Sequence, residues 1–182
     1  MATEREHKKS KANRAVEDAG LIVLLKDKRF QAPSTELRKS IIRHLGLDGT
    51  KDYGHRSFDA IMTPKLGHEV KEDNLSLHID DIVLVEMKTT EKPIKDANLF
   101  GFFFGATERE FKLAEKLGDR YKFAFVVLND NNIYGKPFAV LLSLEELKPR
   151  IRSDRIQRQI NLFGAKSLKT YENPGMLIIQ GT

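Results

Sequence analysis

The sequence predicts an α/β fold in which helices flank a mixed central β-sheet. Three segments contain long apolar runs, as is typical of strands buried on both faces: residues 82–89, 121–128 and 136–142. Segments with apolar residues at three-to-four spacing, which indicate helices, precede and separate these strands. Strands that alternate with helices along a chain pack as a sheet covered by helices. We expect one domain over residues 1–182, because a chain of this length can bury a sizeable core.

Two helices are expected before the first strand. Apolar residues recur at helical spacing over residues 11–28, whereas residues 1–10 are strongly charged and are expected to form a flexible basic tail. Pro33-Ser34-Thr35 opens the second helix, and Gly46 is a natural C-terminal stop for it.

The middle of the chain is expected to be rich in strands. We expect strands over residues 57–63, 75–79 and 82–89. The segment 98–106 is apolar and glycine-rich, and it fits either a strand or a buried loop. The polar segments between these stretches are expected to be turns.

Two helices in the C-terminal half begin with the pattern of a capping box, in which the first and fourth residues satisfy each other's exposed amides. Thr107 and Glu110 open the first of them, and Gly118 ends it. Ser143 and Glu146 open the second, which is short. Two further elements are expected: a helix over residues 153–163 and a terminal strand over residues 175–180.

Charge and composition limit the classes of function. Lys and Arg number 31 against 26 Asp and Glu, the net charge is +5 and the pI is about 9.3, so a polyanionic partner is expected. The absence of Cys excludes disulfides, thiolate zinc sites and cysteine nucleophiles. The N-terminus lacks the apolar stretch of a signal peptide, and no apolar run approaches the roughly 18 residues of a membrane span. We therefore expect a cytoplasmic protein.

The strand over residues 82–89 ends in charged residues. Because side chains alternate between the faces of a strand, Glu86 and Lys88 share one face with Ile82 and Leu84. Two interpretations of the charged pair are open. Either the pair emerges into solvent as an ion pair worth about 0–1 kcal/mol, or it lines a cleft.

Asp59 favours the cleft. It lies within an apolar segment, where a carboxylate is costly to bury without a cation. Two neighbouring carboxylates raise each other's pKa unless a positive group neutralises them, and Mg²⁺ binds one or two protein carboxylates while leaving positions for phosphate oxygens. A lysine beside the ion can orient water and stabilise negative charge on a phosphate under attack. Asp59, Glu86 and Lys88 are therefore a coherent set for metal-assisted phosphodiester hydrolysis.

The pattern of Asp59 followed by Glu86-Met87-Lys88 resembles the motif of the PD-(D/E)XK nuclease superfamily, with Phe58 in place of the proline of the family name. The segment "VEMKTT", followed by "ATEREFKLAEKLGDRYKFAFVV", is more specifically similar to the nuclease-like domain at the C-terminus of the plant NO VEIN protein and in many bacterial restriction-associated proteins. This resemblance covers residues 55–128.

The resemblance implies a restriction-endonuclease-like core with Asp59, Glu86 and Lys88 as catalytic residues. Asp59 and Glu86 would bind Mg²⁺, for which Mn²⁺ can substitute. The substrate would be double-stranded DNA, and cutting both strands with one small site per chain favours a homodimer. A type II restriction endonuclease is the first expectation. The alternatives are a structure-selective nuclease for junctions or repair, and a DNA-binding module that keeps the nuclease fold without cleaving.

Several other residues are candidates with two interpretations. Glu36, on the second helix, is either an additional acid of the active site or a solvated glutamate favoured by the helix dipole. Glu110 is either a further acid of the site or the structural fourth residue of its capping box, and the capping box is the interpretation we adopt. His55 either contacts phosphate or water or is an incidental loop histidine. Thr89 and Thr90 fit phosphate binding or a structural role equally well. Residues that are candidates for DNA contact are Asn131, Arg150, Arg152, Arg155 and Arg158.

Overall fold

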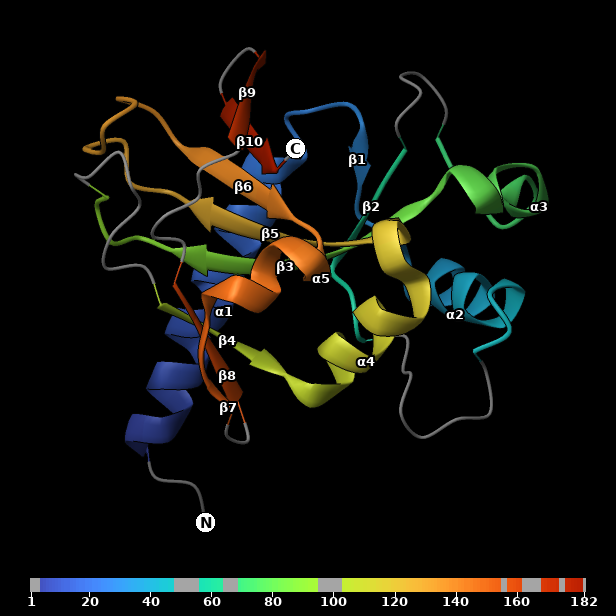
Figure 1. Ribbon diagram of the computed structural model, residues 1–182, viewed down its shortest axis with the longest axis horizontal. Helices are drawn as coiled ribbons and strands as arrows, with labels where there is room; N and C mark the ends of the chain where they lie inside the picture. The colour runs from blue at the N-terminus through green and yellow to red at the C-terminus, as the bar shows by residue number, and fades with distance from the viewer. Residues whose placement is uncertain are drawn as a thin grey trace.

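A seven-stranded mixed β-sheet forms the centre of the protein (Figure 1). The computed structural model describes residues 4–47, 56–63, 69–94, 103–154, 157–161, 168–173 and 176–181, and side chains within 13–47, 56–63, 69–94 and 105–149. The strands, in their order across the sheet, are β1 (Phe30–Gln31), β2 (Ala60–Met62), β3 (Val83–Thr90), β5 (Tyr121–Val127), β6 (Phe138–Leu142), β10 (Met176–Gly181) and β9 (Leu168–Asn173). The pairs β3–β5 and β6–β10 are parallel and the other pairs antiparallel, which confirms the predicted mixed α/β sheet.

Helices cover both faces of this sheet, as the sequence predicts. The long helix α1 (Glu4–Leu24) packs on one face against β3 and β5. The helices α4 (Glu108–Leu117) and α5 (Leu144–Leu147) lie on the opposite face, in front of the sheet in Figure 1. The remaining helical elements are α2 (Thr35–His44), α3 (Leu75–His78), η1 (Ile79–Asp81), η2 (Gly118–Arg120) and η3 (Lys148–Arg150). No helix in the described part of the chain is long and apolar enough to cross a membrane.

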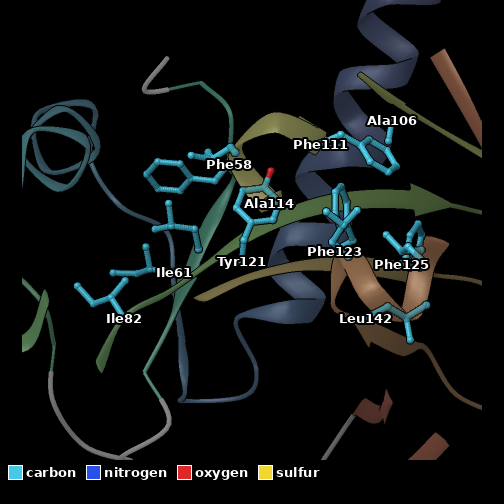
Figure 2. Packing of buried hydrophobic residues seen from close by; sticks show 14 of the residues in the cluster. Phe58, Ile61, Ile82, Ala106, Phe111, Ala114, Tyr121, Phe123, Phe125 and Leu142 are labelled. Carbon is cyan, nitrogen blue, oxygen red and sulfur yellow. The ribbon is translucent and has the colours of Figure 1, made fainter. Parts of the chain in front are cut away.

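The alternation of β5 divides the core into two layers. Tyr121, Phe123 and Phe125 belong to a cluster on the face of the sheet covered by α4, where Phe111 packs with its ring centroid 5.6 Å from that of Phe123 (Figure 2). The intervening small residues belong to a second cluster, which α1 joins through Leu24. Large aromatic rings therefore support the short helices, while small side chains let the long helix approach the sheet.

A second, three-stranded sheet is formed by β4 (Phe103–Thr107), β8 (Gln157–Asn161) and β7 (Ile151–Asp154) in that order. The expected helix over residues 153–163 is therefore wrong. Pairing with β4 explains the difference, because β8 aligns with it from Phe103–Asn161 to Thr107–Gln157, and such long-range pairing overrides local propensity. The apolar segment that fitted a strand or a loop contains a strand.

Two further expectations differ from the structure. Residues 75–79 form α3 and the start of η1 rather than a strand. Directly before α3, the Asn74 side chain closes a turn by hydrogen bonds with the backbone of Glu69 and Lys71. The backbone of the expected N-terminal tail is helical from Glu4 onward. Both capping boxes are confirmed, with each hydroxyl and each glutamate in its reciprocal hydrogen bond.

Candidate active site

On the face of the sheet that α4 covers, Glu86 is buried and Lys88 is half-buried. They follow Leu84 at alternate positions of β3 and are aligned with Phe123 and Phe125 of β5. The Glu86 residue is 6% exposed, and the Lys88 side chain 18%. Of the two interpretations open from the sequence, emergence into solvent is therefore wrong, and the pair lies at the edge of a cleft.

Asp59 directly precedes β2 and extends the pairing of that strand with β3. The register of β2 against β3 stops at Ala60–Val85, and the backbone N–H of Asp59 donates to the Val85 carbonyl at 2.8 Å. The carboxylate Oδ2 of Asp59 then accepts from the N–H of Met87 at 2.9 Å. The Asp59 carboxylate is thereby fixed beside the backbone of Glu86.

The segment before β2 is fixed by side chains from other elements. Arg38 of α2 donates to the carbonyls of Phe58 and Asp59, and its guanidinium lies 5.5 Å from the centroid of the Phe58 ring. The hydroxyl of Tyr121 donates to the Ser57 carbonyl at 2.7 Å. Three consecutive carbonyls are thus held, which limits the movement of Asp59. The sequence gives no local sign of this role for Arg38.

Lys88 lies between two carboxylates. Its Nζ is 2.5 Å from Oε1 of Glu86 and 3.1 Å from Oε1 of Glu110. Glu110 is the fourth residue of the capping box of α4, and its other oxygen accepts from the N–H of Thr107 at 2.9 Å. The interpretation of Glu110 as only a cap is incomplete, because the sequence cannot show that the start of α4 packs over the end of β3.

The protonation of these groups reflects burial and mutual charge. Burial raises the pKa of Glu86 well above its usual value, against the attraction of Lys88, and the charges of Asp59 and Glu110 raise it further. Burial likewise raises the pKa of Asp59, although the Met87 hydrogen bond, Lys88 and Arg38 oppose it. Burial would lower the pKa of Lys88, but Glu86 and Glu110 outweigh it and the pKa is raised. The site thus concentrates more negative than positive charge away from water.

A cavity of about 770 Å³ opens beside the C-terminal half of β3. It brings together the three residues that the sequence singled out, and α1 contributes to its wall from the other side of β3. The lining consists of Asn13, Val16, Glu17, Asp59, Glu86, Met87, Lys88, Thr89, Thr90, Glu91, Lys92, Pro93 and Gly105. The N-terminal helix that supplies an acid to this cavity is therefore α1, through Glu17.

Of the other candidate residues, Thr89 and Thr90 line the cavity, whereas Glu36 and Asn131 do not. Glu36 is 72% exposed, pairs with Lys39 at 2.9 Å and does not line the cavity. Asn131 lies in an exposed turn after β5, where its N–H donates to the Asn129 side chain. Thr89 Oγ1 is buried without a hydrogen-bond partner in the described structure. Thr90 Oγ1 accepts from the N–H of Lys92.

The arginines are placed only through their backbone or not at all. Arg150 ends η3, Arg152 lies in β7 and Arg158 lies in β8, aligned with Ala106 of β4. Arg155 falls outside the described residues, as does His55. The second sheet nevertheless reaches the cavity, because Gly105 of β4 is part of the lining.

The carboxylates suit a hard cation with few protein ligands. No group of three or more His, Cys, Asp or Glu is arranged to hold a metal within the described ranges. Mg²⁺ requires only one or two carboxylates and keeps its waters, and Asp59 and Glu86 provide two beside an open cavity. Burial raises the pKa of both carboxyl groups, and a divalent cation bound beside them would favour their ionised forms.

No family model matches the chain, and no curated protein or solved structure shows a significant match to it. The function must therefore be inferred from the site itself.

Proposed function

We propose that the protein is a metal-dependent endonuclease that hydrolyses DNA phosphodiester bonds, built on a restriction-endonuclease-like core of the PD-(D/E)XK type. The observation that supports this most is the convergence of Asp59, Glu86 and Lys88 on one cavity from two neighbouring strands. Two carboxylates and an ammonium in this order along the chain are the set that the resemblance implies. A type II restriction endonuclease remains the first proposal within this class.

Each residue has a distinct part in the proposed reaction. Asp59 and Glu86 hold Mg²⁺ or Mn²⁺, which when bound neutralises phosphate charge and lowers the pKa of a water. Lys88 presents its ammonium to the phosphate, where it stabilises the negative charge that builds during attack. Because Lys88 is buried and its pKa is raised, it acts as a fixed positive charge rather than as a base. Arg38 and Tyr121 fix the backbone on either side of Phe58 and so hold Asp59 in register.

The surroundings of the cavity suit a polyanionic substrate. The net charge of +5 and the arginines of β7 and β8, in the sheet that borders the cavity through Gly105, favour contacts with the phosphate backbone. We extend the proposal to a homodimer on double-stranded DNA, in which each protomer cuts one strand.

The proposal is tested by incubating the protein with plasmid, a four-way junction and single-stranded DNA, each with Mg²⁺ and with EDTA. Discrete linear fragments from plasmid in Mg²⁺ alone are expected for a restriction enzyme. Cleavage of the junction alone would support a structure-selective nuclease. Binding of DNA without cleavage under Mg²⁺ or Mn²⁺ would leave only a non-cleaving module.

Lys88→Ala is expected to lower kcat for cleavage by at least about 10²-fold while DNA binding is retained. Lys122→Ala is the matched control, because Lys122 is also a half-buried lysine in an ion pair, with Asp119 at 3.7 Å, on the adjacent strand β5. Gel-shift and plasmid-nicking assays measure both properties. Cleavage by Lys88→Ala at the wild-type rate would contradict the assignment of the site.

A further inference from the structure

Glu110 uses its two oxygens for different partners. Oε2 accepts from the N–H of Thr107 and completes the capping box of α4, while Oε1 contacts Nζ of Lys88 at 3.1 Å. The residue is 8% exposed and does not line the cavity. Glu110 therefore contacts Lys88 from α4, outside the cavity lining, whereas Glu86 contacts it from the same strand, β3.

We infer that Glu110 is a positioning residue that keeps the Lys88 ammonium at the cavity independently of Glu86. This inference rests on the proposed function, in which Glu86 is a metal ligand. A carboxylate engaged with a divalent cation is a weaker partner for an ammonium, so Lys88 needs a second acceptor that does not bind the cation. Among the described residues, Glu110 is the other carboxylate in ion-pair contact with Lys88.

The fold makes Glu110 a rigid partner. The cap bond to Thr107 limits rotation of its carboxylate, and α4 is fixed to the sheet by Phe111, whose ring packs against Phe123. Lysine has a flexible four-carbon stem, and the Lys88 side chain retains 18% exposure beside an open cavity. Without Glu110, the ammonium would be free to leave the phosphate position for solvent.

The chain contains a matched control for this role. Ser143 and Glu146 form a second capping box at α5, in which Glu146 Oε2 accepts from the N–H of Ser143 at 2.6 Å. Within the part of the chain that the structure describes, Lys88 forms ion pairs with Glu86 and Glu110 and not with Glu146. The two capping glutamates thus share the capping chemistry and differ in the contact with Lys88.

Glu110→Gln separates the two functions, because glutamine also serves as the fourth residue of a capping box but carries no charge. We expect kcat for DNA cleavage to fall about 10- to 100-fold with KM nearly unchanged, as for partners that orient the ligands of metal sites. Glu146→Gln is expected to leave kcat unchanged. Glu110→Asp, which keeps the charge, is expected to retain more activity than Glu110→Gln. An unchanged kcat in folded Glu110→Gln would overturn the inference.

A second measurement does not depend on cleavage. Urea unfolding of the metal-free protein is followed for Glu110→Gln, Lys88→Met and the double variant, and the same cycle is measured with Glu146→Gln. We expect the midpoint shifts to be non-additive with Glu110 and additive with Glu146. Additive shifts with Glu110 would overturn the inference. If the shifts with Glu110 are non-additive but the protein cuts no DNA, the contact between Glu110 and Lys88 is supported and the proposed function is refuted.

Discussion

At the scale of the residue, the candidate site stores unfavourable charge. Glu86 and Glu110 contact one ammonium, the carboxylate of Asp59 lies beside them, and burial raises the pKa of Asp59 and Glu86. Functional sites often contain such costly groups, because the chemistry requires them and the rest of the fold offsets the cost. The expected consequence is that replacing one of these carboxylates with a neutral side chain stabilises the metal-free protein.

Glu86→Gln is predicted to raise the free energy of unfolding at pH 8, because burial raises the pKa of Glu86 in the folded protein. The folded-state pKa of Glu86 is raised above the usual 4.5, so ionisation favours the unfolded chain. Below that usual pKa the glutamate is protonated in both states and the variant gains nothing. The gain grows as the pH rises from there through the raised pKa, and is constant above it.

Urea unfolding at pH 4 and pH 8 without divalent metal measures this difference. Glu145→Gln is the control, because the Glu145 side chain is 78% exposed and its removal tests only the loss of a surface charge. A destabilised Glu86→Gln at pH 8, or a gain that is larger at pH 4, would show that the ion pair with Lys88 outweighs burial.

Strand alternation predicts which residues of one strand act together, and it predicted Glu86 and Lys88 on a common face. The apolar surroundings of Asp59 added the second acid. Glu110 and Arg38 were missed as parts of the site, because each reaches it from a helix whose packing depends on contacts distant in sequence. The sequence of neither helix indicates which distant residues its side chains contact.

At the scale of the element, α1 approaches β3 closely at Gly20. An added Cβ at Gly20 would lie 2.3 Å from Oγ1 of Thr89. The helix is therefore so close to the strand that a larger side chain than that of glycine would clash. Glu17, about one turn earlier, and Asn13, about two turns earlier, line the cavity. The close approach therefore brings the wall of the cavity to the end of β3.

Gly20→Ala is predicted to destabilise the protein by about 1–3 kcal/mol through overpacking, although alanine is the better helix former by about 1 kcal/mol. Thr89→Ala removes the buried hydroxyl that has no partner in the described structure, and is expected to be close to neutral. The double variant is expected to recover most of the stability that Gly20→Ala removes. Thermal unfolding of the three variants measures this, and a stabilised Gly20→Ala would mean that α1 is not held so closely.

Elements with local end signals were the ones predicted well. Both capping boxes and the apolar strands β3, β5 and β6 depend on neighbouring residues and appear where expected. The predictions for residues 75–79 and 153–163 were wrong. The first segment follows a turn closed by Asn74, and part of the second pairs with β4 as strand β8. Sheet partners are chosen across the whole chain, so no window of sequence contains the information.

At the scale of the whole molecule, the net charge of +5 and its distribution have different consequences. Net charge attracts any polyanion from a distance, whereas the arginines of the second sheet are proposed to contact phosphates near the cavity. The contribution of net charge and that of the second sheet can be separated by removing the same number of positive charges either from that sheet or from another part of the surface.

Arg152→Gln with Arg158→Gln is predicted to weaken binding of double-stranded DNA similarly for all sequences, and to reduce the slope of log K against log salt by about 1 for each phosphate that the protein no longer neutralises. Lys112→Gln with Lys148→Gln is the control, because it also lowers the net charge from +5 by two at surface ion pairs with Glu108 and Glu145. Fluorescence anisotropy with labelled DNA from low to high salt gives both slopes. Equal slopes for the two double variants would mean that the second sheet contributes only its charge, and that the DNA lies on another face of the protein.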